Sequence, residues 1–214
     1  MNVDGMQFDG DALPDAYDVL VDGVKRIKGV PGLTCEIGVR AGLGSALIMN
    51  TCQANDDKRI HVGIDPWGNI DIVLGERIVT ADYTNGMKRE ALKKLYEWCY
   101  NHGQELYMFA MTDTEFFELF AEGIPVHDNG VSLKMNEYAY VFIDGPHNNA
   151  AVQAAIEFFE PKSPVGAVWQ FDNCDAYGHD VAHKWVLEHG FKEFTDEIGI
   201  GGLCFRRSYA RISK

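Results

Sequence analysis

A glycine-rich segment in the first quarter of the chain constrains the fold more than any other feature. It runs Leu33-Thr-Cys-Glu-Ile-Gly-Val-Arg-Ala-Gly-Leu-Gly-Ser45 and leads into Ser45–Met49, which has the pattern of a helix. A short apolar strand, a turn containing Gly38, Gly42 and Gly44, and a helix form the first unit of nucleotide-type α/β folds. Glycine lacks a Cβ and tolerates positive φ, so this backbone can approach a ligand closely. The helix N-terminus offers free N–H groups to a carboxylate or a phosphate.

The spacing of these glycines separates two kinds of cofactor. The dinucleotide fingerprint G-x-G-x-x-G/A, read from Gly42 and Gly44, places Leu47 where helix packing needs a small residue, so that reading fails. The pattern Glu36-x-Gly38-x-x-x-Gly42-x-Gly44 instead resembles motif I of the class I methyltransferases, which use S-adenosylmethionine. The remaining alternative is a glycine loop that only packs tightly against its neighbours.

The resemblance implies a cofactor site at this turn. The amino-acid part of S-adenosylmethionine would be held by Glu36, Gly38, Arg40, Gly42, Gly44 and Ser45. Asp65 ends a second predicted strand, residues 59–65, at the place where this kind of fold sets an acid against ribose hydroxyls. A carboxylate there can accept two hydrogen bonds from a diol. The alternative is a turn-forming Asp before Pro66.

Three further residues are candidates for the adenine end of the cofactor. Trp67 could cover the adenine, or it could be a core aromatic residue. The resemblance places the turn that contains Thr112 and Asp113 near the adenine. The pattern Thr112-x-x-Glu115 is also a capping box, and capping alone explains Thr112 equally well.

Size and charge limit the class of protein and its partners. The chain has 214 residues, enough for one domain, 1–214, with a full core. A formal charge of −13 argues against binding to nucleic acid, which needs clustered Lys and Arg. Five dispersed cysteines without a C-x-x-C pair predict reduced, mostly buried thiols in a cytoplasmic protein. No export signal or run of transmembrane length is found, so no membrane partner is expected, while a homo-oligomer stays open.

Strand and helix patterns alternate along the chain. Helices are predicted near residues 14–28, 45–49, 87–102, 112–120, 148–159 and 179–189, and strands near 33–37, 59–65, 105–110, 138–144, 165–172, 191–198 and 203–208. This order predicts an α/β fold with a Rossmann-like, doubly wound, mostly parallel sheet and an antiparallel C-terminal strand. Residues 1–13 are expected to form a loose arm. Residues 66–86 and 123–136 are candidate substrate loops, the second with a hairpin around Asp128-Asn-Gly130.

Acidic side chains follow two of the predicted strands. Asp144 ends the strand Tyr138–Asp144, and Asp172 and Asn173 end the next strand along the chain. The carboxyl ends of parallel strands lie at one edge of the sheet, with neighbouring strands about 4.8 Å apart, so these residues can reach one ion. Oxygen ligands of this kind suit Mg²⁺ or another hard divalent cation. The alternative is that the acids end their strands without binding a metal.

These acids also carry the most specific resemblance. Ile143-Asp-Gly-x-His147, followed by Gly166-x-x-x-x-Phe-Asp172-Asn, resembles the metal-dependent small-molecule O-methyltransferases, such as the catechol and macrocin O-methyltransferases and cephalosporin hydroxylase-like proteins. The resemblance implies that Asp144, Asp172 and Asn173 are metal ligands. His147 stands where catechol-type enzymes carry the lysine that deprotonates the acceptor hydroxyl, and its ordinary pKa suits a base at neutral pH. The alternative for His147 is an N-cap or loop histidine.

The sequence therefore predicts S-adenosylmethionine-dependent, Mg²⁺-assisted O-methylation of a small hydroxylated molecule. Two other functions are alternatives. An NAD-dependent oxidoreductase is disfavoured by Leu47 and by the absence of a Tyr-x-x-x-Lys pair. A non-catalytic cofactor-binding protein of the same fold stays open. The remaining histidines, His179 and His183 among them, show no ligand spacing that predicts a metal site.

Overall fold

The fold is built on one sheet of seven strands. The computed structural model describes residues 1–9, 14–74, 77–128, 130–145, 148–172, 174, 179–194 and 207–213. The strand order is β12 (Phe191–Glu193), β13 (Arg207–Arg211), β11 (Val168–Phe171), β10 (Tyr138–Ile143), β3 (Leu33–Ile37), β4 (His61–Ile64) and β7 (Leu106–Phe109). All pairs are parallel except those of β13, which runs antiparallel to β11 and β12. The predicted α/β fold with its antiparallel C-terminal strand is confirmed.

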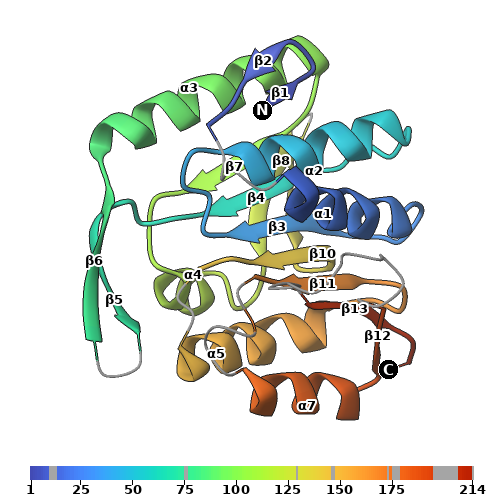
Figure 1. Cartoon of the computed structure of the whole chain (residues 1–214). Helices are drawn as coiled ribbons and strands as arrows, with labels where there is room; N and C mark the ends of the chain where they lie inside the picture. The colour runs from blue at the N-terminus through green and yellow to red at the C-terminus, as the bar shows by residue number, and fades with distance from the viewer. Residues whose placement is uncertain are drawn as a thin grey trace.

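Helices cover both faces of this sheet (Figure 1). One face carries α1 (Pro14–Arg26), α2 (Leu43–Ala54) and α3 (Asn85–His102), and the other carries α4 (Asp113–Leu119), α5 (Asn149–Phe159) and α7 (Asp180–Glu188). A single 3₁₀ turn, η1 (Glu160–Lys162), follows α5. Every residue of β3 and β10 is buried, because central parallel strands have helices on both sides.

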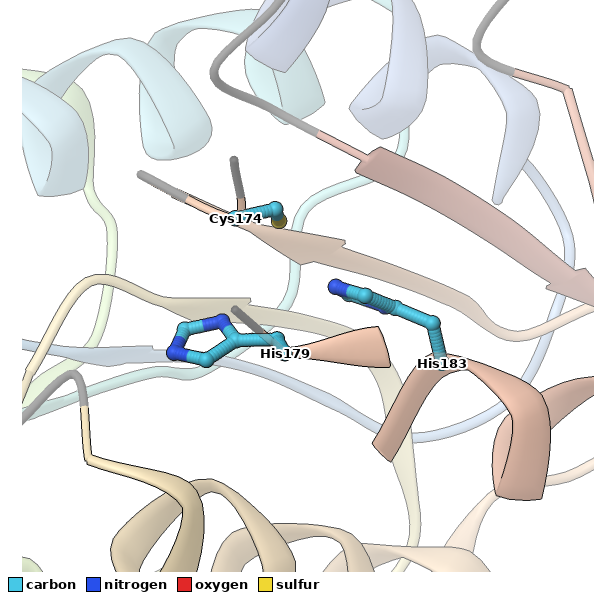
Figure 2. Close-up of side chains that lie close together, drawn as sticks. All are labelled: Cys174, His179 and His183. Atoms are coloured by element: carbon cyan, nitrogen blue, oxygen red, sulfur yellow. The ribbon is translucent and has the colours of Figure 1, made fainter. Parts of the chain in front are cut away.

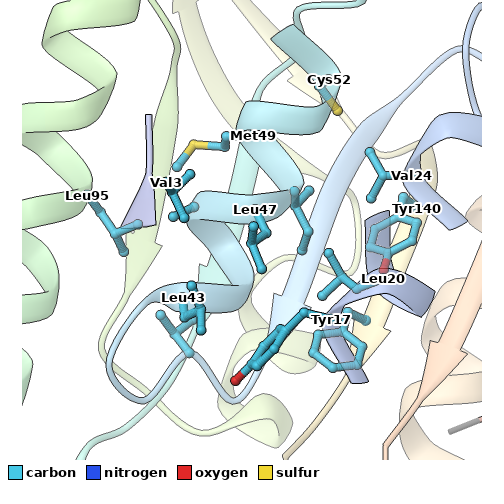
Figure 3. Close-up of a cluster of buried hydrophobic side chains, with 14 of the residues drawn as sticks. Val3, Tyr17, Leu20, Val24, Leu43, Leu47, Met49, Cys52, Leu95 and Tyr140 are labelled. Atoms are coloured by element: carbon cyan, nitrogen blue, oxygen red, sulfur yellow. The ribbon is translucent and has the colours of Figure 1, made fainter. Parts of the chain in front are cut away.

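Two apolar cores fill the spaces between the sheet and its helices. Leu20 of α1, Leu47 of α2 and Tyr140 of β10 belong to the first core (Figure 3). Tyr138 and Ile143 of the same strand belong to the second, with the aromatic residues of α4 and α5. Side chains that alternate along β10 thus serve both cores, which locks the register of this strand.

The three segments that the sequence places outside the main sheet all contain short strands in the structure. The expected loose arm is wrong for residues 1–9, because β1 (Asn2–Val3) and β2 (Met6–Gln7) pair, and Val3 and Phe8 are buried in the first core. Residues 66–86 contain a hairpin, β5 (Gly68–Leu74) with β6 (Arg77–Tyr83), that projects from the body of the molecule (Figure 1). The predicted hairpin in 123–136 is confirmed by β8 (Ile124–Asp128) and β9 (Val131–Met135).

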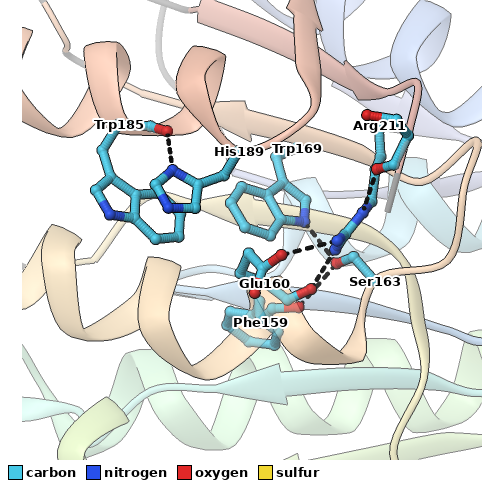
Figure 4. A network of polar contacts seen from close by, with 8 residues as sticks. Phe159, Glu160, Ser163, Trp169, Trp185, His189 and Arg211 are labelled. Carbon is cyan, nitrogen blue, oxygen red and sulfur yellow. Dashed lines mark hydrogen bonds and ion pairs between the residues drawn. The ribbon is translucent and has the colours of Figure 1, made fainter.

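The structure describes only part of the C-terminal strand that the sequence predicts. Strand β13 spans Arg207–Arg211, and residues 203–206 of the predicted strand, with the glycine-rich stretch 198–202, lie outside the described residues. Arg211 donates to the carboxylate of Glu160 at 2.7 Å and also to its backbone carbonyl, and this ties β13 to η1 (Figure 4). The Trp169 indole donates to the Ser163 hydroxyl at 2.9 Å beside this contact. Among the described residues, no helix is both long and apolar enough to cross a membrane.

The N-cap of α5 offers a test of the local structure. Asn148 is the cap, and its side-chain oxygen accepts from the Ala151 N–H at 2.9 Å. Asn148→Ala should lower the free energy of unfolding by about 1 kcal/mol, because that N–H loses its partner. Urea unfolding measures the change. Asn149→Ala, one residue further on and also exposed, is the control and should change stability by less than about 0.5 kcal/mol. Equal losses in both variants would contradict this cap.

Candidate active site

The glycine turn joins β3 to α2 at the carboxyl edge of the sheet. Gly42 is the N-cap of α2 and has φ 89°, and Gly38 has φ 90°. A Cβ on Gly38 would lie 2.1 Å from the carbonyl oxygen of Asp144, at the end of β10. A Cβ on Gly44 would lie 1.9 Å from a carboxylate oxygen of Glu36. Because these glycines lack a side chain, they leave room for the backbone of Asp144 and the carboxyl group of Glu36, as well as for any ligand.

A chain of buried polar side chains runs beneath the turn. The Ser45 hydroxyl donates to the Glu36 carboxylate. The Ser45 Oγ lies 2.9 Å from Nε2 of His61, and His61 Nδ1 lies 2.9 Å from the Thr34 Oγ1. All four side chains are at most 2% exposed. These hydrogen-bonded side chains link β3, α2 and β4, and they support Glu36, the acid that the sequence assigns to the cofactor.

The direction of these hydrogen bonds follows from the charge state of His61. Burial lowers the pKa of His61 to about 3, so the ring is neutral at neutral pH. Because the Ser45 proton is directed to Glu36, the Ser45 oxygen accepts from Nε2–H of His61. Nδ1 then carries the lone pair and accepts from the hydroxyl of Thr34. The hydrogen bonds thus run in one direction, from Thr34 through His61 and Ser45 to the buried carboxyl group of Glu36.

Asp65 lies where the sequence places it, directly after β4. One carboxylate oxygen accepts from the backbone N–H of Arg40 and the other from that of Trp67, each at 2.7 Å. The side chain is 2% exposed. Burial raises the pKa of Asp65, and the backbone hydrogen bonds oppose part of that rise. The carboxylate thus holds the glycine turn against the end of β4, and its role toward a ribose stays a prediction.

Trp67 packs against the same turn. Its indole N–H donates to the carbonyl of Arg40 at 2.9 Å, and the ring belongs to the first core with 4% exposure. This placement agrees with the second of the two expectations for Trp67, a core aromatic residue.

A cavity of about 210 Å³ lies beside the glycine turn, lined by Asp9, Arg40, Ala41, Met87, Glu90, Ala91 and Lys94.

Thr112 and Asp113 open α4 after β7. The Thr112 hydroxyl accepts from the Glu115 N–H at 3.2 Å, and the Glu115 carboxylate accepts from the Thr112 N–H at 2.8 Å. The predicted capping box is confirmed. Asp113 is 8% exposed, and burial raises its pKa. Contact of either residue with an adenine remains a prediction.

The two acids predicted to bind a metal lie at neighbouring strand ends. In the parallel pair β10–β11, Ile143 is opposite Phe171, so Asp144 and Asp172 follow at matching positions. The N–H of Asp172 donates to the carbonyl of Ile143 at 3.0 Å, and both acids are half-buried. Asn173 and His147 lie outside the described residues. The alternative of His147 as a helix cap is wrong, because Asn148 caps α5.

Two groups of residues at the site were not predicted from the sequence. Thr34 and His61 complete the polar chain to Glu36, and the only signal was a histidine within an otherwise apolar strand. The second group consists of Cys174, His179 and His183, whose ligand-type atoms lie within 4.8 Å of one another. Here the signal was a pair of histidines four residues apart, close after a cysteine.

A family model described as a methyltransferase domain matches residues 35–174, from β3 to the residues after β11. The chain belongs to this methyltransferase domain family. It is an S-adenosylmethionine-dependent methyltransferase, as the glycine turn and the strand order predict.

Solved structures share the fold of this methyltransferase at low sequence identity. CalS11, a calicheamicin methyltransferase, has a TM-score of 0.66 at 18% identity, covering 92% of this chain and 80% of that one. The O-methyltransferase NovP has a TM-score of 0.57 at 16% identity, covering 93% and 80%. An SAH-bound methyltransferase from Podospora anserina has a TM-score of 0.54 at 8% identity, covering 94% and 83%. No curated protein matches the sequence.

The neutral state of His61 makes stability depend on pH. Because burial lowers its pKa to about 3, the unfolded methyltransferase binds a proton near pH 6.5 that the folded one excludes. Stability should therefore fall as pH drops below about 6.5, by up to about 1.4 kcal/mol per pH unit from this residue. Urea unfolding between about pH 7.5 and 5.5 measures the slope.

Two variants separate the contribution of His61 to this pH dependence from that of other residues. His61→Gln should flatten the slope, although the part due to His183, whose pKa is also lowered to about 3, remains. His189→Gln, at the exposed end of α7, should keep the full slope. An unchanged slope in His61→Gln would mean that the ring is charged in the folded protein.

Proposed function

We propose that this methyltransferase methylates a hydroxyl oxygen of a small molecule with the assistance of Mg²⁺. The observation that carries the proposal is the matching position of Asp144 and Asp172 at the ends of adjacent parallel strands. The backbone carbonyl of Asp144 lies against Gly38 of the glycine turn, so the two acids lie beside that turn. An acceptor held between them would be within reach of the cofactor's methyl group.

The donor set fits a hard cation. Two half-buried carboxylates, with Asn173 added by the resemblance, offer oxygen atoms alone, and Mg²⁺ prefers oxygen ligands. When bound, Mg²⁺ supplies a Lewis acid that lowers the pKa of an acceptor hydroxyl. The role of His147 is to take the hydroxyl proton, as its position three residues after Asp144 and the resemblance suggest.

The residues around the turn fit the cofactor. Glu36 lies buried with its charge stabilised by Ser45, and is proposed to hold the amino-acid part with the turn residues Gly38, Arg40, Gly42 and Gly44. Asp65 is proposed to accept from ribose hydroxyls through the lone pairs that its two backbone donors leave. Trp67, Thr112 and Asp113 are the candidates for the adenine end. The protein contributes mainly the alignment of the acceptor oxygen with the methyl group and the sulfur of the cofactor, because a methyl sulfonium is already reactive.

The acceptor class is a proposal drawn from the relatives. One CalS11 structure is described as a TDP-rhamnose 3'-O-methyltransferase, and its TM-score is 0.62 at 17% identity. Hydroxylated sugars and nucleotide sugars are therefore the first compounds to screen with methyl-labelled S-adenosylmethionine, followed by phenols.

Removing the metal tests the assignment of the acids. Activity on the acceptor found in the screen should be lost in chelator and should return with Mg²⁺ or Mn²⁺. Asp172→Ala should lose about a hundredfold or more in turnover, while calorimetry finds its affinity for S-adenosylhomocysteine nearly unchanged. Glu188→Gln, on the exposed side of α7, is the control acid and should keep both. Full turnover in chelator would show that the acids act without an ion.

A second test concerns the proposed base. His147→Ala should lose about a hundredfold in turnover, the usual scale of general-base help. Its affinity for S-adenosylhomocysteine should stay constant, because the imidazole is proposed to face the acceptor. The rate of the unchanged protein should rise with pH through an apparent pKa of the histidine or of the bound hydroxyl. Normal turnover in the variant would remove His147 from the mechanism.

A further inference from the structure

Three metal-binding side chains meet beneath the carboxyl end of β11. Cys174 follows β11, His179 is the N-cap of α7, and His183 lies in the first turns of that helix (Figure 2). One ligand atom from each, the sulfur and two ring nitrogens, lies within 4.8 Å of the others. The three residues are 2%, 1% and 2% exposed, so the group is enclosed by protein.

The burial of His183 is costly as the fold stands. Neither of its ring nitrogens has a hydrogen-bond partner among the described residues, although the ring is packed between Phe171 and Tyr209. A buried polar group left without a partner destabilises the folded state.

We propose that Cys174, His179 and His183 bind one Zn²⁺. A thiolate with two imidazoles is a donor set that zinc favours and magnesium does not. Ligand atoms around a tetrahedral zinc lie about 3.3–3.8 Å apart, so small side-chain rotations close the group from its present spread. The thiol proton of Cys174 is released to solvent as the sulfur–zinc bond forms, and a water molecule completes the four ligands.

The charges around the group are compatible with this ion. The guanidinium of Arg207 lies close enough to Cys174 to interact with it electrostatically. Arg207 is itself near two acids, Glu193 and the Asp180 carboxylate at 3.9 Å, which offset its repulsion of a cation. A thiolate also neutralises half of the zinc charge.

A zinc ion here would join the end of β11 to α7. Cys174 is two residues after Asp172, so the ion would hold the segment that carries the proposed magnesium ligands against the helix. The zinc site is distinct in its ligands and does not depend on the proposed methyl transfer. Zinc binding can therefore be measured without an acceptor.

Cobalt substitution tests the site in the full-length protein. The protein is stripped with chelator, titrated with Co²⁺ and then with Zn²⁺, and followed by absorption and by metal content. We expect one equivalent of Co²⁺ to give intense tetrahedral bands and a thiolate charge-transfer band, both removed by one equivalent of Zn²⁺. The weak spectrum of an octahedral, oxygen-bound ion would overturn the proposal.

Matched variants locate the ligands. Cys174→Ser should abolish the charge-transfer band, and His183→Gln should weaken zinc binding at least tenfold. The controls Cys99→Ala, in the first core, and His189→Gln, at the end of α7, should bind as the unchanged protein does. Zinc should raise the melting temperature of the unchanged protein and not that of Cys174→Ser. An unaltered charge-transfer band in Cys174→Ser would overturn the site even if His183→Gln fails to fold.

Discussion

The end of β3 and the end of β10 approach each other so closely that only a glycine fits between them. A Cβ at Gly38 would meet the carbonyl oxygen of Asp144 at 2.1 Å, far inside van der Waals contact. This approach lets β3 and β10 stay paired up to their carboxyl ends, and the N–H of Asp144 donates to the carbonyl of Ile37 at 2.9 Å. The glycine turn and the first proposed metal ligand are therefore parts of one backbone arrangement.

The buried polar chain extends this arrangement across the sheet. Thr34 and His61 lie on neighbouring strands, opposite each other in the β3–β4 register, and direct their hydrogen bonds through Ser45 to Glu36. A buried carboxylate without such donors would be strongly destabilising, and at Gly44 a side chain would collide with it. The acid, the serine and the glycine are thus mutually dependent, so motif I has a structural role besides the role toward the cofactor that the sequence predicts.

Much of this could be predicted from local sequence patterns. The strand–turn–helix of motif I, the capping box at Thr112 and the two-residue hairpin turn after Asp128 each rest on a few adjacent residues, and their elements are confirmed. The sequence did not predict that the N-terminal arm is ordered. Val3 and Phe8 are buried by long-range packing, which no local sequence pattern indicates. The cluster of Cys174 with two histidines was not predicted either, because the spacing of the histidines does not show that α7 folds back onto β11 and brings His183 to Cys174. Sequence alone likewise gave no sign that His61 is a neutral donor within a buried chain.

The register of β10 against β11 has a consequence for how the protein tolerates mutation. Side chains alternate between two cores along these strands, so a slip of one residue would turn Phe171 and Ile143 out of the second core. The same slip would also move Asp144 away from its position beside Asp172. Substitutions in this part of the sheet should therefore deplete the folded population before they alter the spacing of the acids. The molecules that remain folded would keep the geometry of the site, and damage would appear as lower abundance with the activity of each folded molecule preserved.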